Sequence, residues 1–191
     1  MNLQPEAAWE LHLFFTGLSI PYAIIGGMAV QHWGEPRLTQ DVDVTILVPF
    51  ENPTEAIQKI IGRFSARIAD AVAFARRNRV ILVQASNGCP VDISLGLPGY
   101  EEEVMRRAVD YELEPAKRVR LCSAEDLIIH KAVAGRAQDV RDIEGVIYRQ
   151  RNALDIEYIR RWLHDFAEVL GNPEVEQRFE RPWLGKRSSG L

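Results

Sequence analysis

The chain has 191 residues, of which 47% are hydrophobic and 26% charged, a composition typical of a globular protein that buries its own core. Its formal net charge of −4 argues against a protein that coats nucleic acid by bulk electrostatics. Two cysteines, Cys89 and Cys122, exclude a disulfide framework. The sequence shows no signal-peptide pattern and no apolar run near the ~20 residues of a membrane span. We therefore expect a cytoplasmic protein with no membrane partner.

The first 122 residues alternate predicted helices and strands. Apolar residues on a helical repeat indicate the helices, and β-branched or apolar runs bounded by turn residues indicate the strands. In chain order we predict a helix at 4–18, a strand at 22–25, a short helix at 27–33, a strand at 41–48, helices at 52–64 and 70–77, strands at 79–86 and 90–96, a helix at 99–109, and minor strands at 111–114 and 118–122. Thr54 is the candidate cap of the helix at 52–64.

From Ser123 onward the pattern is helical, with helices predicted at 123–135, 138–150, 155–170 and 173–181. Ser123 followed by Asp126 is a capping arrangement that begins the first of these helices. We expect the tail from Gly185 to be frayed. The sequence therefore predicts an α+β fold with two regions, an α/β core over residues 1–122 and a C-terminal helical region over 123–191.

Three aspartates lie in apolar strands, where carboxylates are uncommon. Asp41 and Asp43 are two residues apart, so both would project from one face of their strand and would repel each other unless a positive group lies between them. Asp92 lies in the strand at 90–96, and the three carboxylates converge if the two strands are neighbours. Such a cluster can hold Mg²⁺ together with substrate phosphates. The alternative is that Asp41 is a turn residue and Asp92 a strand-end residue, each solvated.

Gly26 and Gly27 follow the strand at 22–25 and precede the predicted short helix. Glycine tolerates unusual dihedral angles and lets a phosphate approach the main chain, and a helix N-terminus presents N–H groups to it. Most Gly-Gly pairs after a strand are only tight turns. The position of this pair upstream of Asp41 favours a triphosphate-binding turn.

The stretch IIGGMAVQHWGEPRLTQDVDV, residues 24–44, resembles the signature of the DNA-polymerase-beta-like nucleotidyltransferase superfamily. The pattern from Arg37 through Thr39 to Asp43 is close to that of its bacterial branch related to the AbiEii toxin. In that branch the second turn residue is often serine, whereas here it is Gly27. The resemblance implies a nucleotidyltransferase-like mixed sheet with flanking helices and a C-terminal helical bundle. It further implies that Asp41, Asp43 and Asp92 are catalytic and bind metal, and that Gly26, Gly27 and Thr39 bind nucleotide.

The stretch SAEDLIIHKAVAGRAQDVRDIEGVI, residues 123–147, resembles the second signature of that branch. The resemblance implies that Lys131 and Arg136 contact phosphate and that Asp139 contacts the nucleotide or the acceptor. On one continuous helix Lys131 and Arg136 would lie about 140° apart and could flank a bound group. The alternative is that these residues, with Asp142, form salt bridges on a surface helix.

We therefore expect a Mg²⁺-dependent nucleotidyltransferase, with Mn²⁺ as the alternative metal, that moves a nucleoside monophosphate from an NTP to an acceptor hydroxyl and releases pyrophosphate. The acceptor could be RNA such as a tRNA end, a protein side chain or a small molecule of the aminoglycoside type. The branch resemblance suggests a toxin–antitoxin role, with an antitoxin protein as partner. The alternatives are a non-catalytic nucleotide-binding or protein-interaction module on the same fold, and metal-dependent phosphodiester hydrolysis.

Overall fold

The computed structural model describes residues 3–187, which form nine α-helices, one short 3-10 helix and seven strands. The chain divides into two compact units. One contains the residues up to Met28 together with Leu38–Cys122, and the other contains Ala29–Arg37 together with the residues from Ser123 onward. The segment Ala29–Arg37 therefore belongs to the helical unit, although about 85 residues of chain separate it from the rest of that unit.

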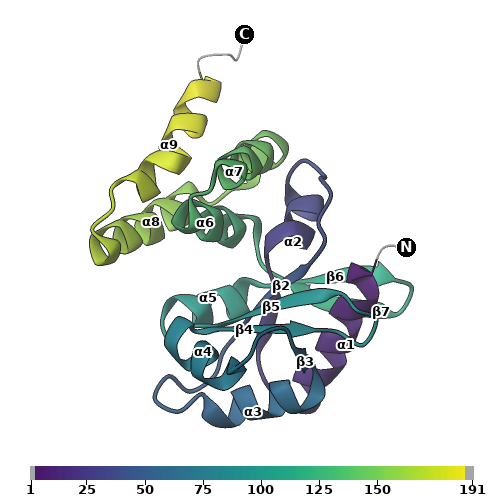
Figure 1. The fold of residues 1–191 in the computed structure, drawn as a ribbon. Coiled ribbons are helices and arrows are strands. Elements are labelled where there is room, and N and C mark those ends of the chain that lie inside the picture. The colour runs from purple at the N-terminus through teal and green to yellow at the C-terminus, as the bar shows by residue number, and fades with distance from the viewer. Residues whose placement is uncertain (1–2, 188–191) are drawn as a thin grey trace. The chain divides into compact units, whose positions relative to one another are not determined.

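A single mixed sheet forms the centre of the first unit, with the strand order β3-β4-β5-β2-β1-β7-β6 (Figure 1). The pairs β2–β5 and β1–β7 are parallel, and the other neighbours are antiparallel. The strands are β1 (Tyr22–Ile24), β2 (Val42–Ile46), β3 (Ser65–Ala66), β4 (Val80–Gln84), β5 (Pro90–Leu95), β6 (Val109–Glu114) and β7 (Lys117–Leu121). Every residue of β1 is buried, as expected for a central strand with a short apolar sequence.

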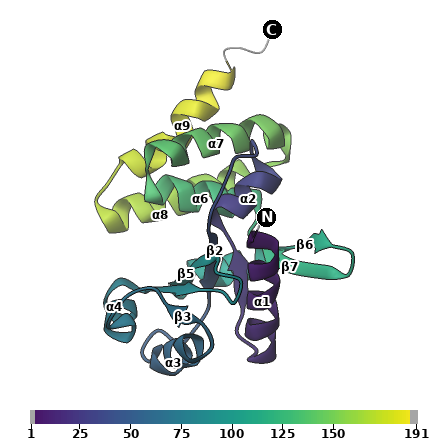
Figure 2. The same ribbon diagram turned by 45° about the vertical axis from the view of Figure 1, so that its right-hand side comes forward.

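Four helices flank this sheet: α1 (Gln4–Gly17), α3 (Thr54–Arg63), α4 (Ala71–Asn78) and α5 (Tyr100–Arg107). Helix α1 lies alongside β7 (Figure 2). It buries Ala7, Ala8, Leu11 and Phe15, which recur at helical spacing on one face. Helix α3 buries Ile57 and Ile60 in the same way. These faces, together with the apolar side chains of β2, β4 and β5, form the core of the unit.

The helical unit contains α6 (Ala124–Ala134), α7 (Ala137–Gln150), the 3-10 helix η1 (Arg151–Ala153), α8 (Ile156–Leu170) and α9 (Glu174–Arg187). Its core is formed by side chains from all four α-helices, including Leu127, Ile128, Ile143, Val146, Ile159, Leu163, Val175 and Phe179. Helix α2 (Gly26–Trp33) begins in the first unit and ends in the second. Within residues 3–187, none of the helices combines the length and apolar character that crossing a bilayer requires.

The predicted elements agree with the observed ones in type and order, with four differences. Helix α3 begins at Thr54, so Thr54 is its first residue and not its cap. The N–H of Thr54 donates a hydrogen bond to the side-chain oxygen of Asn52 (3.3 Å). Helix α9 continues through Pro182 to Arg187 because Trp183 stacks on Phe179, with ring centroids 5.9 Å apart. The expectation of a frayed tail is therefore wrong for residues 185–187, and residues 188–191 lie outside the described part. The strand β3 and the helix η1 are too short to leave a sequence pattern.

Candidate functional site

The strands that carry Asp43 and Asp92 are neighbours in the sheet. Strands β2 and β5 run parallel in a register that pairs Asp43 directly with Asp92. Directly paired residues of adjacent strands project from the same face, with their Cα atoms about 5 Å apart. Asp41 lies in a bend just before β2 rather than within the strand, and its carboxylate is close enough to raise the pKa of Asp92. Three carboxylates therefore gather at one place in the first unit.

The two glycines make room for site side chains. Gly26 adopts φ +61°, and a Cβ atom at this position would overlap the carboxylate of Asp43. A Cβ atom at Gly27 would overlap the side chain of Thr39. The Thr39 hydroxyl in turn donates a hydrogen bond to Oδ1 of Asp41 (2.8 Å). The glycine turn is therefore packed against the carboxylate cluster, a requirement that is additional to any contact with phosphate.

An arginine that the sequence analysis did not identify pairs with this cluster. The guanidinium of Arg67 donates a hydrogen bond to Asp92, and both side chains are about one-third exposed. Burial raises the pKa of Asp92, the guanidinium of Arg67 opposes that shift, and the carboxylate of Asp41 adds to it. Arg67 follows the two-residue strand β3, and its N–H donates to the carbonyl of Leu82, which lies opposite Asp92. No local sequence pattern marks Arg67, because its contact with Asp92 depends on how β3, β4 and β5 pair in the sheet.

The donor set suits a hard divalent cation, because all three side chains offer carboxylate oxygens. As the side chains lie, however, no group of three His, Cys, Asp or Glu residues within 3–187 is arranged to hold a metal ion. Asp92 is turned to Arg67 and Asp41 to Thr39. Binding of a cation through Oδ1 of Asp92 would therefore require the guanidinium of Arg67 to leave that atom.

A second cluster lies in the helical unit and is centred on the buried Lys131. Its Nζ atom is 2.9 Å from Oδ1 of Asp139 and 2.9 Å from Oδ2 of Asp142, and both carboxylates are almost fully buried. Arg136 contacts Asp139 with its Nε atom (2.8 Å), and Arg37 contacts Asp142 in the same way (2.8 Å). The structure therefore contains a salt-bridge network, as in the alternative, although Lys131 and both carboxylates are buried rather than on the surface.

These pairs set the protonation of both carboxylates. Burial alone would raise the pKa of Asp142, but hydrogen bonds from Arg37, Lys131 and Gln138 outweigh it and lower the pKa to about 2. Burial would likewise raise the pKa of Asp139, but hydrogen bonds from Arg136 and Lys131 outweigh it and lower the pKa. Both groups are therefore ionised near neutral pH and hold Lys131 in place.

Lys131 and Arg136 do not share a helix. Helix α6 ends at Ala134, Gly135 adopts φ +68°, and α7 begins at Ala137 with Arg136 as its cap residue. The angle of about 140° expected on one continuous helix is therefore wrong, because a glycine in the left-handed region ends the helix between the two residues. Asp139 accepts a hydrogen bond from the main-chain N–H of Arg136 (3.0 Å), so it also caps α7.

The predicted site residues thus fall into two groups. The first unit contains Gly26, Gly27, Thr39, Asp41, Asp43 and Asp92, and the helical unit contains Lys131, Arg136 and Asp139. The side chain of Arg136 is 74% exposed, whereas Lys131 is buried between its carboxylates.

A mixed sheet with acidic residues on two adjacent parallel strands, combined with a helical unit, defines a nucleotidyltransferase-like fold. Residues 9–183 match the family described as "Nucleotidyltransferase of unknown function (DUF6036)". The match covers most of the chain, and the protein therefore belongs to this family. A comparison with curated protein sequences gives no match.

Solved structures share this fold. An antigenic nucleotidyltransferase-like protein from Paracoccidioides brasiliensis is similar with a TM-score of 0.53 and 17% identity, over 92% of this chain and 91% of that one. ANT(2")-Ia, in complex with adenylyl-2"-tobramycin, is similar with a TM-score of 0.54 and 15% identity, over 87% of this chain and 98% of that one. At these identities the likeness shows the fold.

Proposed function

We propose that this protein is a metal-dependent nucleotidyltransferase that transfers a nucleoside monophosphate from an NTP to an acceptor hydroxyl and releases pyrophosphate. The observation that carries the proposal is the direct pairing of Asp43 with Asp92 on adjacent parallel strands, with Asp41 beside them. Carboxylates so close together destabilise the apo protein by mutual repulsion, a cost that a cation-dependent reaction would explain.

Asp41, Asp43 and Asp92 would hold Mg²⁺, or Mn²⁺ in its place. When bound, the metal would neutralise charge on the phosphates and lower the pKa of the acceptor hydroxyl. We assign to Asp92 the additional role of assisting deprotonation of that hydroxyl, because it is paired directly with Asp43 at the same place in the sheet. Arg67 would leave Asp92 when the cation arrives.

We assign Gly26 and Gly27, at the N-terminus of α2, to the triphosphate, which the main-chain N–H groups of a helix N-terminus attract. Thr39 would orient Asp41 through its hydroxyl. Lys131 and Arg136 would neutralise the charge of the departing pyrophosphate, and Asp139 would orient both cations.

Three acceptor classes follow from the resemblances. The fold likeness to ANT(2")-Ia, which was solved with an adenylylated aminoglycoside, supports a small hydroxylated molecule. The resemblance to the branch related to the AbiEii toxin supports RNA or a protein side chain, with a toxin–antitoxin role and an antitoxin as partner. We retain a non-catalytic nucleotide-binding or protein-interaction module as the alternative, because Asp92 and Lys131 both have protein partners in this structure.

The test is a transfer assay with each of four α-³²P-labelled NTPs, with Mg²⁺ or Mn²⁺, and with tRNA, the protein itself and an aminoglycoside mixture as acceptors. Asp43→Asn and Asp92→Asn would run beside Asp165→Asn, which changes an exposed aspartate on α8. We expect label on one acceptor class with the wild type and with Asp165→Asn only, and pyrophosphate as the second product.

Metal-dependent nucleotide binding without transfer would support the non-catalytic module. Cleavage of a phosphodiester without release of pyrophosphate would indicate hydrolysis instead. Neither binding nor transfer would refute the assignment of Asp43 and Asp92.

A further inference from the structure

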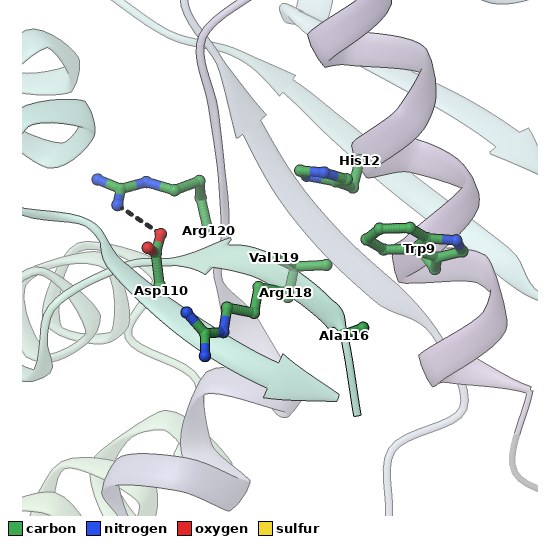
Figure 3. Close-up of a pocket in the computed structure, with 7 residues that line it drawn as sticks. All are labelled: Trp9, His12, Asp110, Ala116, Arg118, Val119 and Arg120. Carbon is green, nitrogen blue, oxygen red and sulfur yellow. Dashed lines mark hydrogen bonds and ion pairs between the residues drawn. The ribbon is translucent and has the colours of Figure 1, made fainter. Parts of the chain in front are cut away.

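A pocket of about 450 Å³ opens in the first unit between helix α1 and the β6–β7 hairpin (Figure 3). None of the residues assigned to nucleotidyl transfer lines it. Six of its lining residues carry rings, charges or apolar groups that bear on its ligand: Trp9, His12, Asp110, Arg118, Val119 and Arg120.

One wall of the pocket is aromatic. The rings of Trp9 and His12 are stacked, with centroids 4.8 Å apart and an angle of 18° between their planes. Both residues are only partly buried, and the side chain of Val119 points toward them from β7 (Figure 3). Val119 is itself buried, so the surface of this wall that a ligand can reach is that of the two rings, and a flat ligand stacked on them would exchange water for aromatic contacts.

The opposite side of the pocket is a main-chain edge. Strand β1 pairs with β7 only at Ile24 and Leu121, so within residues 3–187 no strand covers the rest of this edge of β7. The N–H of Arg120 donates to the Tyr22 hydroxyl (3.0 Å), so it points away from β6. Alternate residues of an antiparallel strand present their main-chain groups on the same side. The N–H and C=O of Arg118, which lines the pocket, therefore point the same way, away from β6.

The charges at the pocket are matched. Arg120 pairs with Asp110 (2.9 Å), and Arg118 lies 3.6 Å from Glu112. Burial lowers the pKa of His12, against the opposing effect of Asp110, so the imidazole is neutral at pH 7. A ligand recognised here would be held by stacking and hydrogen bonds, and a bare phosphate would find no surplus positive charge.

We propose that this pocket binds a nucleobase, which stacks against Trp9 and His12 and forms paired hydrogen bonds with the main-chain N–H and C=O of Arg118. Every base carries a neighbouring donor and acceptor on its Watson–Crick edge, and stacking on aromatic side chains is how proteins hold unpaired bases. An added peptide strand would instead pair along several residues, whereas this edge presents the donor and acceptor of one. The pocket is a second nucleotide-binding place, independent of the carboxylates and beyond the proposed transferase activity.

The test is a titration of the ¹⁵N-labelled full chain with adenosine in the absence of divalent cations, followed by NMR of the tryptophan indole N–H groups. We expect a saturable shift of the Trp9 signal, which Trp9→Phe identifies. Trp9→Ala lacks this reporter and is followed through the main-chain amide signal of Arg118; it should weaken binding by about 10-fold or more, the loss typical of one base-stacking contact. Arg118→Pro removes the main-chain donor and should weaken binding similarly, whereas Arg118→Ala keeps that donor and should leave affinity unchanged.

Two ligand-side controls do not depend on the folding of a variant. 1-Methyladenosine, whose Watson–Crick edge is blocked, and ribose 5-phosphate, which has no base, should both fail to shift Trp9. Equal binding of ribose 5-phosphate would make this an anion site. Binding of an extended peptide in place of adenosine would make it a docking edge, and no shift with adenosine would remove the site. Each of these three results overturns the proposal.

Discussion

Replacement of Lys131 by methionine tests the buried cluster of the helical unit. The substitution keeps the length of the side chain and removes its charge. It leaves Asp139 and Asp142, whose side chains are 1% and 2% exposed, without the cation that joins them. Removing one partner of a buried ion pair typically costs about 3–5 kcal/mol. Each carboxylate keeps an arginine partner, so we expect a loss at the lower end, about 3 kcal/mol in the free energy of unfolding.

The measurement is urea denaturation at pH 7, with amide hydrogen exchange in α6 and α7 as a local readout because the chain has two compact units. Lys59→Met is the matched control, since Lys59 is half-exposed and pairs only along its own helix with Glu55. It should leave stability within the error of the fit. A Lys131→Met protein as stable as wild type would refute the conclusion that Asp139 and Asp142 hold this ammonium.

The same cluster predicts a pH dependence. The pKa of Asp142 is lowered in the folded state to about 2, so its contribution is fully present above the unfolded value of about 3.9 and is lost as the pH falls through about 2. At 1.36 kcal/mol per pKa unit, the contribution is about 2–3 kcal/mol. Asp142→Asn should remove this part of the acid dependence between pH 4 and pH 2.

Three further predictions concern single side chains. Gly26→Ala should reduce nucleotidyl transfer by about 10-fold or more, because the new Cβ atom would displace the carboxylate of Asp43. An unchanged transfer rate would contradict the packing of Gly26 against Asp43. Arg67→Gln removes the cation that competes with a metal ion for Asp92, so half-maximal transfer should be reached at a lower Mg²⁺ concentration; an unchanged Mg²⁺ requirement would exclude this competition. Ser123→Ala removes the cap of α6 and should cost about 1–3 kcal/mol in urea denaturation.

Most helices and strands could be predicted from the sequence, and so could the position of acidic residues beside apolar strand residues. Helical and alternating apolar patterns predicted the order of helices and strands because each depends on residues that are close in the chain. The carboxylates of Asp41 and Asp43 were conspicuous because few other roles place one acid within an apolar strand and a second just before it. Their approach to Asp92 depends on a register between strands about 50 residues apart, which no local pattern encodes.

Features that depend on distant packing could not be predicted. Arg67 reaches Asp92 only because β4 lies between β3 and β5. Arg37 belongs to the helical unit because it pairs with Asp142, 105 residues further along the chain. The spacing from Lys131 to Arg136 suggested two groups on one helix, and the break at Gly135 changes that geometry completely.

The burial of Lys131 is compatible with its proposed contact to phosphate. If Lys131 moved to a phosphate, Asp139 would still be bound by Arg136, and Asp142 would still be bound by Arg37 and Gln138. Neither carboxylate would be left as an isolated buried charge, which is the outcome that makes breaking such a network most costly. Structural and ligand-binding roles for this lysine therefore predict different defects in one variant. Lys131→Met should lose stability without nucleotide, and it should also gain less stability than wild type when nucleotide is added.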